Sequence, residues 1–253
     1  MGASLPSPLT ENPWSGAAAP WPEPEPWPQT REDLVAAQDV LARTMPTPWV
    51  PDPGGVRAAA GCFVCFARGT TGRGQAGDAG WAGAALLVDG RLVDVAAVRG
   101  TAGAPYEPGV LALREGPLLE AAVRALRLRP QVLLVNATGR DHPRRAGLAV
   151  HLGARLDLPT IGVTSRPLLA SGVMPANAPG ARSPLLLAGQ HVGYWLRVRP
   201  DVRPLAVHAA WRTDPDVAAM VVLALVGLAL TPEPLRQARR AARDARAADH
   251  RRR

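Results

Sequence analysis

The residues best suited to chemistry follow a short apolar run in the middle of the chain. Val132–Val135 shows no alternation of polar and apolar side chains, which predicts a strand buried on both faces. Asn136 is the first polar residue after it, at the strand end where open α/β sheets bind ligands. A loop with His142 and the basic pair Arg144 and Arg145 follows. These side chains could carry a proton or contact a phosphate.

The elements that must hold these residues can be read from periodicity and turn signals. We expect, in chain order, helix 30–43, strands 59–67, 81–88 and 91–98, helix 116–126, a strand from 131, a helix to about 156, strands 159–163, 183–187 and 191–198, a short strand 202–206 and a helix from 214 or 216 to 230. Three antiparallel strands, a helix and a further strand predict an α/β fold, with a mixed five-stranded sheet and helices on its faces.

Composition narrows the class of protein. The chain has 253 residues and a net charge of +8, and every basic residue is Arg, which suits phosphate contacts and permits a nucleic-acid partner. No stretch reaches transmembrane length, and the N-terminus lacks a signal pattern, so we expect no membrane partner. Cys62 and Cys65 are predicted to be small buried residues rather than a redox or metal pair. A reducing, cytoplasmic location fits them.

The two ends differ in composition from the centre. Residues 1–29 combine many prolines with Trp14, Trp21 and Trp27, which predicts a disordered or extended tail. Residues 30–235 form the expected domain, and 236–253 form an Arg-rich tail with a helical face of one sign. The first tail is a partner-docking segment or, more simply, a solvated one. The second is a phosphate-tracking arm or a solvated basic tail.

Three segments resemble the endonuclease V family of metal-dependent nucleases, which recognise deoxyinosine in DNA repair. They are the YEPG of 106–109, the LREGP of 113–117 and the block 131–166, in the family's order and spacing. The resemblance covers roughly residues 34–236. It implies a ribonuclease H-like fold, Mg²⁺ as cofactor and nucleic acid as partner, either DNA or RNA. We expect a monomer.

The resemblance also implies where the metal ligands should be. Glu115 matches the family's Glu, and Asp216 matches a later acid. Two metal-binding Asp positions fall on Phe63 and Asn136, and the family's catalytic Lys falls on Ser165. Because Mg²⁺ needs anionic oxygen ligands, the replacement of two Asp by Phe63 and Asn136 predicts a very low affinity for the metal.

The segments that would grip a substrate are retained. Tyr106 and Pro108 match a wedge that pries strands apart. The positions that would line a pocket for a flipped base are Gly109, Leu111, Ala137, Leu148 and Leu168. The residues expected to contact phosphates are Arg114, Arg144, Arg145 and His151. His142 is a proton carrier, a phosphate donor or a cap of the next helix.

Three hypotheses remain open. The first is a family member that has lost hydrolysis and kept nucleic-acid binding. The second is an active deoxyinosine endonuclease with a rearranged metal site, for which Asp78, Asp94 and Asp141 are the candidate acids, Asp141 being the best placed. The third is an interaction protein that acts through its tails.

Overall fold

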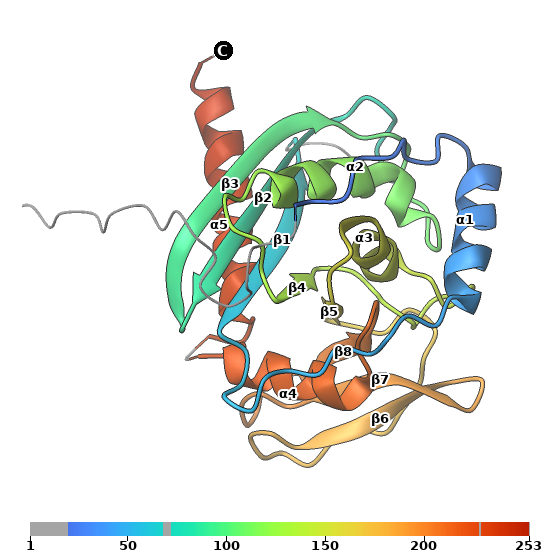
Figure 1. Ribbon diagram of the computed structural model, residues 1–253, viewed down its shortest axis with the longest axis vertical. Coiled ribbons are helices and arrows are strands. Elements are labelled where there is room, and N and C mark those ends of the chain that lie inside the picture. Colours follow the sequence, from blue (N-terminus) through green and yellow to red (C-terminus); the bar gives the residue numbers. More distant parts are fainter. Residues whose placement is uncertain (1–19, 68–71, 228, 253) are drawn as a thin grey trace, which may run out of the picture.

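The computed structural model describes residues 20–67, 72–227 and 229–252 and centres on an eight-stranded sheet (Figure 1). The helices are α1 (Arg31–Arg43), α2 (Leu111–Arg124), α3 (Leu148–Leu156), α4 (Pro215–Leu225) and α5 (Glu233–His250). The strands are β1 (Ala58–Phe66), β2 (Ala79–Val88), β3 (Arg91–Thr101), β4 (Val132–Val135), β5 (Thr160–Thr164), β6 (Arg182–Leu187), β7 (Gln190–Leu196) and β8 (Leu205–Ala209). Within the described part of the chain, no helix is long and apolar enough to cross a membrane.

The strand order is β3-β2-β1-β4-β5-β8-β7-β6. Strands β1, β4 and β5 run parallel, and the flanking pairs are antiparallel. The mixed sheet predicted from the sequence is therefore confirmed, but the expected five strands were too few. β6, β7 and β8 join the same sheet because β8 pairs with β5, with Ile161 opposite Ala209.

Local signals explain where several elements begin and turn. The Thr30 side chain accepts a hydrogen bond from the Asp33 N–H at 3.1 Å and caps α1. Asp214 caps α4 in the same way through the Val217 N–H at 2.7 Å. Asp89 and Gly90 both have positive φ, +47° and +75°, which gives the tight hairpin predicted between β2 and β3.

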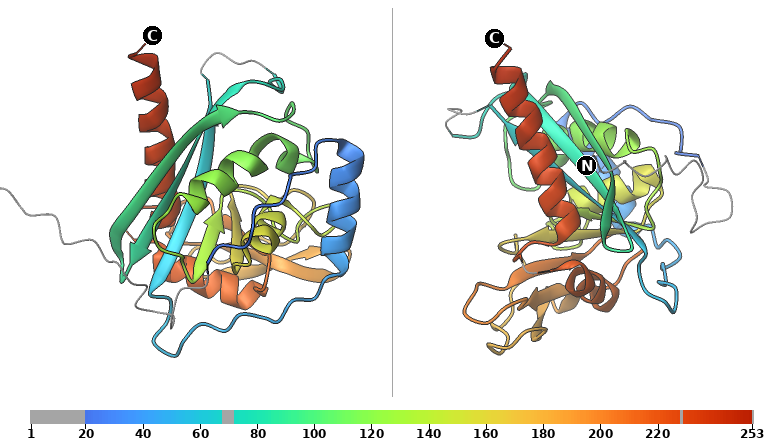
Figure 2. Two further views of the ribbon diagram at one scale, coloured as in Figure 1. Left: turned by 45° about the horizontal axis from the view of Figure 1, so that its top comes forward. Right: turned by 90° about the vertical axis from the view of Figure 1, so that its left-hand side faces the viewer.

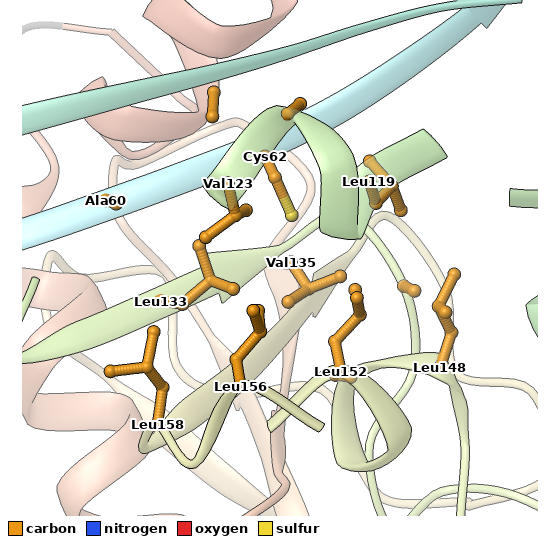
Figure 3. Close-up of a cluster of buried hydrophobic side chains, with 14 of the residues drawn as sticks. Ala60, Cys62, Leu119, Val123, Leu133, Val135, Leu148, Leu152, Leu156 and Leu158 are labelled. Carbon is orange, nitrogen blue, oxygen red and sulfur yellow. The ribbon is translucent and has the colours of Figure 1, made fainter. Parts of the chain in front are cut away.

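The larger core lies between the β1–β4 side of the sheet and helices α2 and α3. Leu133 and Val135 of β4 meet Val123 of α2 and Leu152 of α3 there (Figure 3). Cys62 belongs to this cluster, whereas Cys65 lines a groove beside α5, on the opposite face. Both cysteines are free; Cys62 is buried as predicted, whereas Cys65 is only partly buried, because its side chain faces the groove. A second core packs β4, β5 and β8 against α4 and the start of α5.

The predicted C-terminal tail is instead an integral helix. Helix α5 lies along β1, β2 and β3 (Figure 2) and buries Leu235, Ala238 and Ala242. It approaches so closely that a Cβ at Gly61 would lie 2.4 Å from the Pro234 carbonyl carbon, and one at Gly83 would lie 2.4 Å from the Ala238 oxygen. The sequence showed the charged face of this helix. The face that contacts the sheet consists mainly of small residues such as Ala238 and Ala242, which form no apolar pattern strong enough to predict burial.

The predicted N-terminal tail also needs correction where it is described. Residues 1–19 of that prediction lie outside the described residues. Residues 20–29 run over α2 and α3, where Trp27 is buried. Its Nε1 donates to the Glu120 carboxylate at 2.6 Å, and its ring stacks on His151 at 4.9 Å. This proline-rich segment is thus held by Trp27 between two helices and by hydrogen bonds from Arg124, Arg129 and Arg155 to its backbone carbonyls.

Candidate functional site

One cavity of about 290 Å³ opens beside the carboxyl ends of β4 and β5. It lies between α1, the start of α2 and the loops that follow the two strands. Its lining residues are Gln38, Tyr106, Pro108, Gly109, Leu111, Ala112, Asn136, Ala137, Thr138, His142, Leu148, Thr164, Arg166, Pro167 and Leu168. The structure thus brings together every position expected to form the wedge and the base pocket.

The carbonyl oxygen of Gly109 fixes the turn that precedes α2. It accepts hydrogen bonds from Gln38 Nε2 at 3.2 Å, His142 Nε2 at 3.0 Å and Arg144 Nη2 at 3.2 Å. Gly109 has φ +84°, a left-handed conformation that favours glycine. Arg144 Nε also donates to Gln38 Oε1 at 2.7 Å. The turn that carries Tyr106 and Pro108 is therefore tied to α1 and to the β4–α3 loop.

His142 holds this turn rather than carrying protons. Its Nδ1 accepts from the Arg144 N–H at 3.2 Å, which leaves Nε2 as the donor to Gly109. Burial lowers the pKa of the imidazole to about 4. Both ring nitrogens have protein partners and the ring is neutral at physiological pH, so the expected roles of proton carrier, phosphate donor and helix cap do not fit its contacts.

Arg114, expected to contact phosphates, is directed into the protein. Its guanidinium is buried, pairs with Asp78 at 2.9 Å and donates to the Ala104 carbonyl at 2.7 Å. It also lies 4.0 Å from the centre of the Phe66 ring. These contacts hold the segments around 75–78 and 104 against α2. They direct the N–H groups of Arg114 into the protein, where they cannot contact a phosphate at the surface.

Arg145 and His151 are likewise directed into the protein, although Arg145 Nη1 and His151 Nδ1 are buried without a hydrogen-bond partner. Arg145 Nη2 donates to the Leu187 carbonyl at 2.6 Å, which links the β4–α3 loop to β6. His151 lies buried under Trp27, and burial lowers its pKa to about 4. These contacts differ from the phosphate contacts that we expected for both residues. The sequence did not show that β6 would lie beside Arg145 or that Trp27 would cover His151.

Asp141, the best placed candidate for a substitute metal ligand, is an anchor for the backbone. Its carboxylate is fully buried and accepts from the N–H groups of Leu168, Leu169 and Ala170 at 2.6, 2.9 and 2.7 Å. His208 Nδ1 lies 3.7 Å away. The loop after β5, including the pocket residue Leu168, is therefore held by this side chain.

Glu115 and Phe63 belong to opposite faces of the sheet. Glu115 extends from α2, where burial raises the pKa of its carboxyl to about 7 against the opposing effect of Arg114. Its charge in turn helps to raise the pKa of the Cys62 thiol, which shows that it lies near Cys62. Phe63 instead faces α5, with its ring 4.8 Å from the Arg239 guanidinium carbon.

The other expected catalytic positions lie after β4, after β5 and in α4. Asn136 is exposed at the pocket wall, and Ser165 is exposed on the loop after β5. Asp216 lies in the first turn of α4, where it accepts from the Tyr194 hydroxyl at 3.0 Å and pairs with Arg182 at 3.2 Å. Asn136 and Ser165 carry no charge, and the charge of Asp216 is paired with Arg182, so these residues form no cluster of negative charge.

Six residues of the pocket lining were not among the candidates named from the sequence: Gln38, Ala112, Thr138, Thr164, Arg166 and Pro167. Gln38 is buried in α1, and its signal was a single polar residue on an otherwise apolar helical face. Arg166 lines the pocket from the loop after β5 and carried no signal beyond its place after a strand.

Comparison with known proteins agrees with this geometry. The family model described as Endonuclease V matches residues 57–240. The chain belongs to the endonuclease V family. A relative named Endonuclease V from Methanopyrus kandleri is 38% identical over 212 residues, which cover 83% of this chain and 86% of the relative.

Solved structures of endonuclease V share the fold. The crystal structure from Streptomyces avermitilis is 34% identical, covers 88% of this chain and 96% of its own, and has a TM-score of 0.79. Endonuclease V from Ciona intestinalis, solved with a 24mer DNA containing an inosine followed by a ribo-adenosine, covers 86% of this chain and 98% of its own at 19% identity, with a TM-score of 0.71. The ribonuclease H-like fold expected from the sequence is confirmed.

Members of the endonuclease V family are metal-dependent, but the donor set of this chain does not fit Mg²⁺. Phe63 offers no oxygen, Asn136 only a neutral one, and the Glu115 carboxyl is kept partly protonated near pH 7. Across the described ranges, no group of three or more His, Cys, Asp or Glu side chains is arranged to hold a metal ion.

Proposed function

We propose that this endonuclease V-family chain binds nucleic acid at deoxyinosine-type lesions and hydrolyses the phosphodiester weakly or not at all. The observation that carries the proposal is the separation of two features that should coincide in an active nuclease. The positions proposed as wedge and base pocket line one cavity around Gly109, while no three His, Cys, Asp or Glu side chains of the described residues are arranged to hold a metal ion.

The binding half of the proposal rests on the pocket. Its volume, about 290 Å³, is at the lower end for small-molecule sites, which suits a single extruded base. Tyr106 is 45% exposed at its edge, on a turn held by three hydrogen bonds to Gly109. A rigid exposed aromatic can offset the unstacking of a base by new stacking. The related Ciona intestinalis protein was solved with inosine-containing DNA.

The proposed loss of hydrolysis rests on the fact that each acid that could replace a missing metal ligand already has protein partners. Asp78 pairs with Arg114, and Asp94 pairs with Arg127 at 3.3 Å. Asp141 accepts three backbone hydrogen bonds. Recruiting any of them to a metal would break these contacts, which disfavours a rearranged two-metal site.

The test compares binding with cleavage on one substrate. Purified protein is incubated with a deoxyinosine-containing oligonucleotide and its undamaged counterpart, with Mg²⁺ or Mn²⁺ present or chelated. We expect tighter binding to the deoxyinosine strand in both conditions and no cleavage near the lesion. Metal-dependent cleavage that Glu115→Ala abolishes would overturn the loss of hydrolysis, and equal affinity for the two strands would overturn lesion recognition.

A constructive test restores the missing groups through Phe63→Asp, Asn136→Asp and Ser165→Lys together. Arg239 lies over position 63, so a new carboxylate there would pair with the guanidinium instead of a metal. The triple variant is therefore also made with Arg239→Ala. We expect metal-dependent cleavage to appear first in the quadruple variant. A folded quadruple variant without cleavage would contradict the assignment of these positions.

A further inference from the structure

Helix α5 carries a stripe of basic side chains that have no acidic partner. The stripe consists of Arg239, Arg243, Arg246 and His250, spaced by four, three and four residues, which places them on one helical face. Among the described residues, none of the four forms an ion pair. On the same helix, the Arg236 guanidinium pairs with Glu233 at 2.7 Å and that of Arg240 with Asp244 at 3.6 Å. The helix therefore pairs its other arginines with acids and leaves Arg239, Arg243 and Arg246 without an acidic partner among the described residues.

The stripe borders a groove of about 790 Å³ between α5 and β1. Phe63 and Cys65 form the β1 wall, and Arg243, Arg246 and His250 line the helix side together with Asp244 and Ala247. Arg246 Nη1 donates to the Phe66 carbonyl at 2.9 Å, which fixes that side chain beside the wall. Arg239 stacks on Phe63 at 4.8 Å. The groove is thus a preformed channel with cations along one side.

We propose that this groove holds the sugar–phosphate backbone of a nucleic-acid strand, without a metal ion, as a second contact surface beside the lesion pocket. The proposal extends the proposed function and concerns a different surface. Arginine binds phosphate through paired N–H groups, and unpaired arginines release counterions when a polyanion binds. From Arg239 to His250 the stripe covers roughly 16 Å along the helix axis.

The register of the sheet connects the groove to the pocket. Cys62 of β1 pairs with Val135, the last residue of β4, so Phe63 and the residue that follows β4, Asn136, lie at the same end of these two neighbouring strands. Phe63 lines the groove and Asn136 lines the pocket. A strand that places one base in the pocket is therefore near the start of the groove. This continuity, with the repeated spacing of the cations, favours a nucleic-acid strand over an acidic protein.

The test measures affinity for an undamaged single-stranded oligonucleotide by fluorescence anisotropy, with metal chelated. The double variant Arg243→Gln/Arg246→Gln is compared with Arg236→Gln/Arg240→Gln, which removes equal charge from the paired arginines of the same helix. We expect the groove variant to bind about tenfold more weakly and its salt dependence to lose a slope of about 1.4, or 0.7 per lost phosphate contact. The control pair should change affinity less than twofold.

Two further variants protect the result from effects on folding. Arg246 has a structural contact, so Arg243→Gln is also measured alone, with thermal melting of every variant. Asp244→Asn removes the acid that lines the groove and should tighten binding. Cys65, the partly exposed thiol of the wall, should be protected from iodoacetamide by the oligonucleotide.

The outcomes separate this proposal from lesion recognition. Equal affinities of the groove and control variants, or no protection of Cys65, would overturn the groove. A polyglutamate peptide that binds as tightly as the oligonucleotide would also overturn it, because the surface would then suit acidic protein. Lesion recognition is judged independently by the ratio of affinities for deoxyinosine and undamaged strands, which the groove variants should leave unchanged.

Discussion

The Nε2 atom of His142 lies 3.0 Å from the carbonyl oxygen of Gly109, and this contact joins the β4–α3 loop to the turn that carries Tyr106 and Pro108. The bond makes His142 a positioning residue for the pocket. The same histidine, read in the sequence beside Arg144, had suggested proton transfer.

Replacing His142 therefore tests geometry against proton chemistry. His142→Ala should reduce the preference for deoxyinosine over undamaged strand about fivefold, which corresponds to one hydrogen bond of about 1 kcal/mol. Because burial holds the imidazole pKa at about 4, the preference of the unmodified protein should be constant from pH 5.5 to 8. His191→Ala, at an exposed ring, is the control. A preference that titrates near pH 6.5 and is lost in His142→Ala would show that a charged His142 contacts the substrate.

Three buried histidines predict a loss of stability in mild acid. Burial lowers the pKa values of His142 and His151 to about 4 in the folded state, from an ordinary value of 6.5, and it also lowers the pKa of His208 against the opposing effect of Asp141. The unfolded chain therefore binds more protons between these values. Their contribution to the free energy of unfolding is complete above pH 6.5 and is lost as the pH falls towards 4, by on the order of 1–3 kcal/mol for each histidine.

Urea unfolding between pH 4 and 8 measures this effect. His151→Phe removes one titrating ring and keeps an aromatic partner for Trp27, so its unfolding free energy should fall less steeply with acid. An unchanged slope in that variant would contradict the burial of His151.

Glu115 should lower the stability of the protein as the pH rises, which is opposite to the effect of the buried histidines. Burial raises its carboxyl pKa to about 7 in the folded state, above the usual 4.5, so the folded state binds more protons between these values. Stability is therefore lost as the pH rises from 4.5 to 7. Glu115→Gln should be more stable than the unmodified chain by about 1–3 kcal/mol at pH 8 and equally stable below pH 4.5. Melting curves are also measured with millimolar Mg²⁺, which should not stabilise the protein. Stabilisation by Mg²⁺ that Glu115→Gln abolishes would reveal a metal site.

Trp27 should anchor the N-terminal segment to α2 and α3. Trp27→Ala removes the stack on His151 and the hydrogen bond to Glu120 and should cost about 3 kcal/mol in unfolding free energy. Trp27→Phe keeps a ring and should cost about 1 kcal/mol, because Glu120 retains its ion pairs with Arg124 and Arg155. Trp21→Ala is the matched control at a partly buried tryptophan. If all three variants melted with the unmodified protein, residues 20–29 would not be packed as described.

Several features of this protein were determined by the sequence alone. The composition of its apolar runs placed β1, β2, β4 and β5, because strands buried on both faces need continuous apolar side chains. The half-exposed β3 was placed by the Asp89–Gly90 turn signal that precedes it. The motifs around Tyr106 and Glu115 indicated the family. The absence of acidic side chains at positions 63 and 136 was visible without coordinates, because charge is a property of residue type.

Only the tertiary structure decided what each polar side chain contacts. Asp141 and Arg114 have the residue types of a metal ligand and a phosphate contact, yet each is buried against groups far away in the sequence. Trp27 and α5 looked like parts of tails because their partners are distant surfaces, Glu120 and Gly83 respectively. Local patterns report which face of an element is apolar, whereas the hydrogen-bond partners of a buried polar group depend on how the whole chain packs.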